Sequence, residues 1–281
     1  MEDESVREGL TWQIGVWDRM SDIYLHEIDK RFAPVIESVL ARAGLEPGHH
    51  VLDLGTGTGA VAERAAPKVA PAGQVVGVDV SDAMLALAQQ RMVAQGITNV
   101  NFREGRAEKL PADDGSFDAV LASLSLMYVI DRAAAAREIA RVLRPGGRLV
   151  GAVWAGPDQC DIVHFQQIAG SFAPPPPVPG VGPGTLADPE PFLEQLATAG
   201  IQARSDTETL GFDFEDFGSA WNVLAGVTAA QLVPERQQKA KDAILAAMYP
   251  DGDGPRHFRN VTRFIIGERQ EATNRAPLLT D

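Results

Sequence analysis

The feature that most constrains the fold of this chain is a short apolar run that ends in an acid and is followed at once by alternating glycines. Residues 51–60 read VLDLGTGTGA. A buried strand, a tight turn and the start of a helix account for this order, because glycine adopts positive φ and leaves the backbone N–H groups open to a ligand. The spacing of Gly55, Gly57 and Ala60 also satisfies the loose dinucleotide fingerprint. The segment therefore predicts a cofactor cradle and leaves the ligand open.

Further segments follow this cradle in a definite order. Residues 73–80 read GQVVGVDV, a second apolar strand whose acid, Asp79, stands where a pair of ribose hydroxyls needs an acceptor. The later segments read VNFREGRAEKLP at 100–111, SFDAVLAS at 116–123 and EIARVLRPGGRL at 138–149. In this order and spacing they closely resemble the class I S-adenosylmethionine-dependent methyltransferases, particularly the small-molecule branch that is similar to ubiquinone/menaquinone-biosynthesis enzymes. The resemblance covers roughly residues 35–155.

The alternation of short apolar runs with stretches of helical period indicates strands buried on both faces and crossover helices between them. The pattern predicts helix over 6–44, and strands near 50–54, 75–79, 99–103, 117–122, 148–154, 201–209 and 258–266. We therefore expect an α/β fold with a Rossmann-like, doubly wound, mostly parallel seven-stranded sheet. The resemblance implies that the last strand is antiparallel and that inserted helices form a cap.

We expect one structural domain with four parts: an N-terminal helical lid over 1–48, a cofactor-binding core over 49–155, a stretch over 156–250, and a final strand and tail over 251–281. The third part contains a proline-rich loop, a core helix and strand, and the helical cap insertion. The loop fits either a solvated connector or a flap over the substrate. In the lid, Trp12, Trp17 and Tyr24 suit either a cover over the methyl donor or ordinary core packing.

Composition and charge narrow the partners. The 281 residues carry a formal net charge of −13, which opposes general binding to nucleic acid, and their apolar runs are shorter than a membrane span requires. The start of the chain lacks the regions of a signal peptide, so we expect a cytoplasmic protein. The single cysteine, Cys160, rules out an intramolecular disulfide and a cysteine-based metal cluster, and we expect no metal. The expected partner is a small-molecule substrate, and the sequence leaves a homodimer open.

The resemblance implies S-adenosylmethionine as the cofactor and gives each part of the cradle a role. Asp53 is expected to organise the methionine amine, and Asp79 to accept hydrogen bonds from both ribose hydroxyls. Relatives often carry an acid where Arg106 stands; arginine has no acceptor, so Glu108 or a backbone carbonyl is expected to meet the adenine amine. The other implied cofactor contacts are Gly55, Thr56, Gly57, Gly59, Val80, Met84, Ala107 and Ser123.

Methyl transfer needs few reactive side chains, because a sulfonium methyl group is already activated and requires mainly an aligned acceptor and a dry site. Relatives often show two histidines where Met127 and Tyr128 stand, so no imidazole is expected there. The candidate catalytic residues are His164, as a general base, Tyr128 and Tyr24. We predict direct in-line methyl transfer to a small organic molecule, with O- or C-methylation favoured over N-methylation. The alternatives are an NAD(P)-dependent oxidoreductase and an S-adenosylmethionine-binding protein that does not methylate.

Overall fold

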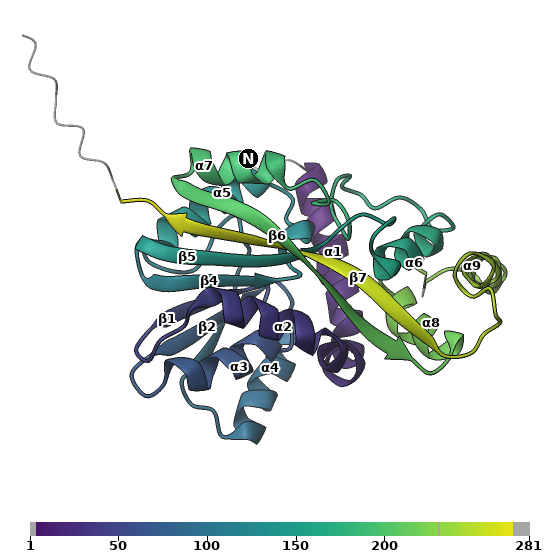
Figure 1. Ribbon diagram of the computed structural model, residues 1–281, viewed down its shortest axis with the longest axis horizontal. Coiled ribbons are helices and arrows are strands. Elements are labelled where there is room, and N and C mark those ends of the chain that lie inside the picture. Colours follow the sequence, from purple (N-terminus) through teal and green to yellow (C-terminus); the bar gives the residue numbers. More distant parts are fainter. Residues whose placement is uncertain (1–3, 230, 272–281) are drawn as a thin grey trace, which may run out of the picture.

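The computed structural model describes residues 4–229 and 231–271, and its centre is a seven-stranded sheet with the order β3-β2-β1-β4-β5-β7-β6 (Figure 1). Neighbouring strands from β3 to β5 are parallel, whereas β7 runs antiparallel to both β5 and β6. The predicted fold class and the antiparallel last strand are therefore confirmed. The strands are β1 (His50–Leu54), β2 (Gln74–Asp79), β3 (Val100–Glu104), β4 (Phe117–Ser123), β5 (Leu143–Trp154), β6 (Ile201–Phe214) and β7 (Arg256–Arg269).

Helices cover the sheet and extend beyond it. The long strands β6 and β7 reach past the core toward α8 and α9, and α1 lies between the core and these cap helices (Figure 1). None of the helices in the described part of the chain is long and apolar enough to cross a membrane. The helices are α1 (Glu4–Ile23), η1 (Tyr24–Ile28), α2 (Asp29–Ala43), α3 (Ala60–Val69), α4 (Asp82–Gln95), η2 (Leu126–Tyr128), α5 (Arg132–Val142), α6 (Asp161–Gly170), α7 (Glu190–Thr198), α8 (Phe217–Leu224), η3 (Ala225–Val227) and α9 (Pro234–Met248).

Local signals set several of the boundaries that position the site. Ser81 caps α4, because its hydroxyl accepts a hydrogen bond from the Met84 amide, and Gly96 ends the helix at a φ of 66°. Asp131 caps α5 in the same way, through the Ala134 amide. Both ends of α4 are thus set by residues that adjoin it in the chain.

Strand β7 extends beyond the predicted 258–266 at both ends, and β5 and β6 are longer than the sequence predicts as well. β5 begins at Leu143 instead of 148, and it includes residues 145–147, where the pairing with β4 shifts register between Phe117 and Ala119. β6 continues from 209 to Phe214, because β7 pairs with it along its whole length. Partners distant in sequence thus extend β5 and β6.

The predicted helix over 6–44 is interrupted by one wide turn. Residues Tyr24–Ile28 form a π-helix between α1 and α2. Such turns insert one residue into the helical register and are frequent at functional sites. Here the turn directs Tyr24 toward a cavity at the carboxyl ends of the strands.

Candidate functional site

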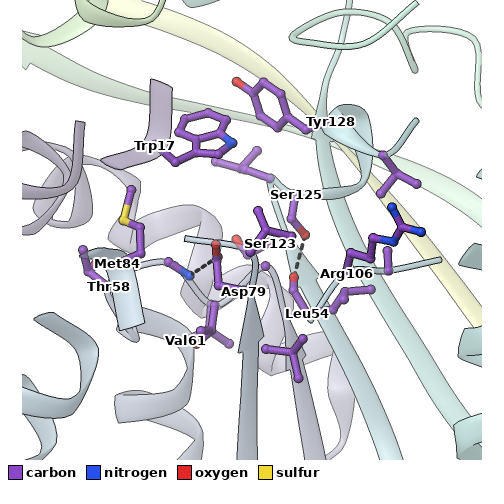
Figure 2. Close-up of a pocket in the computed structure, with 18 of the residues that line it drawn as sticks. Trp17, Leu54, Thr58, Val61, Asp79, Met84, Arg106, Ser123, Ser125 and Tyr128 are labelled. Atoms are coloured by element: carbon purple, nitrogen blue, oxygen red, sulfur yellow. Dashed lines mark hydrogen bonds between the residues drawn. The ribbon is translucent and has the colours of Figure 1, made fainter. Parts of the chain in front are cut away.

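A cavity that opens to solvent, with ≈ 1190 Å³ of empty space including the solvent at its mouth, lies at the carboxyl ends of β1, β2 and β4 (Figure 2). The strand order reverses between β1 and β4, and open α/β sheets bind their ligands at such a switch point. One side of the cavity is formed by the glycine turn after β1 and by the ends of β2 and β4. The other side comes from α1, η1 and the start of α2.

The glycine turn has the backbone conformation predicted for it. Gly55, Gly57 and Gly59 have φ angles of 69°, 53° and 80°, which side chains with a Cβ rarely adopt. A Cβ on Gly55 would lie 2.4 Å from the Cβ of Ser125. The amides of Gly55 and Thr56 both donate to the Val78 carbonyl, at 2.8 and 3.0 Å, so the turn is tied to the end of β2.

Asp79, the last residue of β2, faces the cavity with its carboxylate fixed from behind. One oxygen, Oδ2, accepts from the Gly57 amide at 2.8 Å, and Oδ1 accepts from the Ser81 amide at 3.0 Å. Burial raises the pKa of this carboxyl above its ordinary value, and the charge of Asp18 raises it further, against the lowering effect of the backbone hydrogen bonds. Each carboxylate oxygen has a second lone pair, so Asp79 is able to accept from two more hydroxyls.

Asp53 lies behind the turn and does not line the cavity. It is 1% exposed, and its Oδ2 accepts from the Thr56 hydroxyl at 2.6 Å and from the Ala62 amide at 3.2 Å. Burial raises its pKa to about 7. Its other oxygen, Oδ1, is buried without a hydrogen-bond partner among the described residues. Asp53 thus shapes the turn, and its role toward a methionine amine stays a prediction.

Aromatic rings form the wall opposite the glycine turn. The Trp17 ring stands perpendicular to those of Tyr24 and Tyr128, with centroid distances of 5.9 and 4.7 Å. Trp17 and Tyr128 lie together above Asp79 and the end of β4 (Figure 2). Burial raises the pKa of both tyrosines, so each phenol stays protonated near neutral pH and acts as a hydrogen-bond donor.

The structure brings most of the predicted site residues to one cavity. The predicted residues that line it are Tyr24, Gly55, Thr56, Gly57, Asp79, Val80, Met84, Ala107, Glu108, Ser123 and Tyr128. Glu108 is partly engaged, because its Oε1 accepts from the amides of Ile130 and Asp131, both at 3.2 Å. Gly59 begins α3 behind the turn, beside Asp53.

His164 lies apart from these residues. It is half-buried on α6, which packs against α9 and β7 and so belongs to the cap side of the molecule. The expected position of His164 at the substrate pocket is not observed, because α6 contributes no residue to the cavity wall. A role as general base therefore stays a prediction that the geometry does not favour.

Several lining residues carry no clear signal in the sequence. Leu124, at the end of β4, has a φ of 59°, a strained conformation that costs a non-glycine residue roughly 1–3 kcal/mol and occurs mostly at functional sites. The next residue, Ser125, donates to the Leu54 carbonyl at 2.6 Å and so joins β4 to β1 across the cavity floor. Asp29 accepts from the Thr58 hydroxyl and from Arg91, at 2.5 and 2.6 Å. Asp29 is one of several acids in the predicted helix over 6–44, so the sequence did not single it out.

Comparisons with known proteins agree with this geometry. Residues 52–151 match a family described as "Methyltransferase domain". The ubiquinone/menaquinone biosynthesis C-methyltransferases UbiE of Ectopseudomonas mendocina and Pasteurella multocida are 38% and 37% identical over 138 and 140 residues, 48% of this chain in each case. The chain spans about half the length of these curated relatives, 52% and 50%. The UbiE enzyme of Serratia proteamaculans is 33% identical over 224 residues, which cover 76% of this chain and 83% of that enzyme.

Solved structures show the same fold at lower identity. The YcgJ protein from Bacillus subtilis superposes with a TM-score of 0.62 at 23% identity, covering 86% of this chain and 99% of that one. A geranyl diphosphate methyltransferase in complex with SAM gives a TM-score of 0.53 at 22% identity, covering 84% of each chain. The likeness thus extends over most of the sheet and its helices.

Proposed function

The chain belongs to the class I S-adenosylmethionine-dependent methyltransferases, in the branch of the UbiE-like enzymes, and we propose that it methylates an apolar small molecule at carbon or oxygen. S-adenosylmethionine is its methyl donor. The observation that carries the proposal is the contrast within one cavity between a polar floor and an aromatic wall. The nicotinamide alternative is set aside, because the relatives are methyltransferases.

The cavity fits the cofactor on the evidence of its own residues. Asp79 presents a carboxylate with free lone pairs, as a ribose diol needs, and the glycine turn beside it leaves a cradle without side chains. Val80 and Met84 offer an apolar surface for the adenine, and Ala107 lies at the same end of the cavity wall. When bound, the cofactor supplies a methyl group on a positively charged sulfur.

The opposite wall suits an apolar acceptor. It comes from α1, α2 and the segment after β4, and its apolar or aromatic members are Leu10, Trp17, Phe32, Ile36, Tyr128 and Ile130. These side chains exclude water from the reacting atoms, and the faces of Trp17 and Tyr128 stabilise a nearby cation. The phenols of Tyr24 and Tyr128 donate hydrogen bonds to the acceptor and fix its orientation.

The ionisable groups of the wall favour an acceptor that needs no strong base. Asp29 is hydrogen-bonded to Arg91 and Thr58, and the Asp79 carboxylate accepts hydrogen bonds from two backbone amides. Among the described residues that line the cavity there is no histidine. We therefore favour transfer to a nucleophilic carbon, such as that of an enol or a phenol ring, or to an oxygen that arrives ionised.

The test is an assay with S-adenosylmethionine that carries a deuterated methyl group. Phenols, hydroquinones and enolic compounds serve as acceptors, each with matched analogues in which either the oxygen or the reactive carbon is blocked. We expect a labelled product whose methyl group mass spectrometry places on carbon, and its formation should stop when that carbon is blocked; a label on oxygen would show O-methylation instead. Tight cofactor binding without any labelled product would instead support the non-methylating binder.

A further inference from the structure

Helix α1 crosses the cavity and is hydrogen-bonded to both of its rims. On one rim, Asp18 Oδ1 accepts from the Ser81 hydroxyl at 2.6 Å. On the other rim, the side-chain amide of Gln13 donates to the Tyr128 carbonyl at 3.0 Å. Trp17, between these two residues, contributes its ring to the cavity wall (Figure 2). Ligands as large as the cofactor therefore meet α1 as one side of their binding site.

Ser81 connects α1 directly to the carboxylate expected to bind ribose. Its side chain is fully buried and caps α4 through the Met84 amide at 3.1 Å. Its own amide donates to Asp79 Oδ1 at 3.0 Å. A hydroxyl has a single hydrogen, and here it points to Asp18. A continuous chain of hydrogen bonds thus runs from α1 through Ser81 and Asp79 to the glycine turn at Gly57.

We propose that Asp18 is a positioning residue whose bond to Ser81 holds α1 closed over the cavity and couples this closure to the charge of the bound ligand. The proposal goes beyond the methyl-transfer reaction argued above, because it concerns how α1 responds to the donor and to its demethylated product. It rests on cofactor binding alone and is independent of the acceptor.

The charge on the ligand sulfur determines whether the closed position of α1 is favoured. Closure brings the Asp18 carboxylate toward that of Asp79, and the two negative charges repel each other. A ligand with a positive sulfonium offsets this repulsion and favours the closed position of α1. After methyl transfer the sulfur is a neutral thioether, so the repulsion returns and the closed position is less favourable. The hydrogen bond between Asp18 and Ser81, which we call the Asp18 latch, therefore retains the donor and releases the product.

Apolar contacts hold the rest of α1 without regard to the ligand. A Cβ on Gly226 of η3 would lie 2.2 Å from the Met20 sulfur, and one on Gly9 would lie 2.1 Å from Val178 of the proline-rich loop. These close approaches keep α1 packed on the cap and on the loop. Helix α1 also packs against α4 itself, so loss of the Asp18 latch is expected to loosen one rim of the cavity without unfolding the helix.

The experiment compares Asp18→Ala, Asp18→Asn and the control Asp22→Asn. Asp22 lies one turn further along α1 and is exposed, so its replacement removes the same charge from the same helix away from Ser81. Dissociation rates of S-adenosylmethionine and of S-adenosylhomocysteine are measured by stopped-flow tryptophan fluorescence. Hydrogen exchange of the α1 amides is followed with each ligand, and apo melting temperatures confirm folding.

We expect Asp18→Ala to speed release of S-adenosylmethionine about ten-fold, the effect of losing one hydrogen bond to a charged group. Asp18→Asn keeps an acceptor for the Ser81 hydroxyl, so it should release S-adenosylmethionine more slowly than Asp18→Ala does. It should also narrow the difference between the release rates of the two ligands. Asp22→Asn should match the wild type in both rates. Equal release rates for Asp18→Ala and Asp22→Asn, or equal protection of α1 by both ligands in the wild type, would overturn the proposal.

Discussion

At the scale of single residues, Asp79 serves the turn and the ligand with the same carboxylate. The amides of Gly57 and Ser81 each donate to one of its oxygens, and the carboxylate also lines the cavity. Asp79→Ala should therefore lower affinity for S-adenosylmethionine at least about ten-fold, since hydrogen bonds to a charged group contribute about 1.5–3 kcal/mol each. Titration calorimetry measures this change.

Glu104 provides the control for Asp79. It is the register partner of Asp79 at the end of β3, and its side chain is exposed. Glu104→Ala removes an equal charge from the same edge of the sheet and should leave the dissociation constant unchanged. If both variants bind as the wild type does, the assignment of Asp79 to ribose is wrong.

A substitution at Gly57 tests whether the glycine turn binds the cofactor, and a second strained glycine serves as its control. A Cβ there would have the Met84 sulfur as its nearest neighbour, at 3.9 Å, so the space next to the backbone is free and the φ of 53° is what penalises a side chain. Gly57→Val should cost about 1–3 kcal/mol of stability and abolish cofactor binding. Gly96→Val introduces a similar strain at a φ of 66°, at the end of α4. It should lower the melting temperature comparably and still bind. Normal turnover by folded Gly57→Val protein would contradict a donor-binding turn.

At the scale of elements, the connection between α1 and α2 decides which candidate side chains reach the reaction. The π-helix turns Tyr24 into the cavity, whereas α6 keeps His164 on the cap side. Tyr24→Phe removes a hydrogen-bond donor and should lower kcat about ten-fold without changing the pH profile, because the raised pKa keeps the phenol protonated. His164→Ala should change kcat only a few-fold.

A general base role for His164 makes the opposite prediction. The rate would fall at least about 10²-fold, and the acidic limb of the pH profile would disappear. Steady-state rates at saturating donor between pH 5 and 8 distinguish the two cases. A large loss in His164→Ala with intact cofactor affinity would show that α6 moves toward the cavity during the reaction.

The elements that the sequence predicted well are those determined by neighbours along the chain. The strand, acid and glycines over 51–60 specify their own turn, and Ser81 and Gly96 mark the two ends of α4. The π-helix and the early start of β5 depend on contacts between distant segments, and no glycine or proline lies within Tyr24–Ile28 to mark the interruption. The positive φ of Leu124 is equally a product of tertiary structure, since leucine has no preference for it.

At the scale of the whole molecule, acidic side chains lie in the interior as well as on the surface. The chain has a formal net charge of −13, and burial raises the pKa of three carboxyls around the cavity, Asp29, Asp53 and Asp79. Glu138, which is less buried and bonded to Arg141, has instead a lowered pKa. Asp53, whose raised pKa is about 7, therefore contributes to the pH dependence of stability above about pH 5.

Asp53 makes that dependence testable. Its pKa rises from an ordinary 3.8 to about 7, so the folded state holds the proton more tightly than the unfolded chain does. Its contribution to the free energy of unfolding is fully present below the unfolded pKa and is lost as pH rises from about 4 to about 7, by at most about 4 kcal/mol. We expect apo protein to lose stability between pH 5 and 8 in urea titrations.

Asp53→Asn should flatten this slope, even if the amide lowers stability overall beside the unpaired Oδ1 position. Asp113→Asn, an exposed substitution, should retain the wild-type slope. If Asp53→Asn and the wild type lose stability equally over this range, the cost of the buried charge is relieved elsewhere, for example by water reaching the back of the glycine turn.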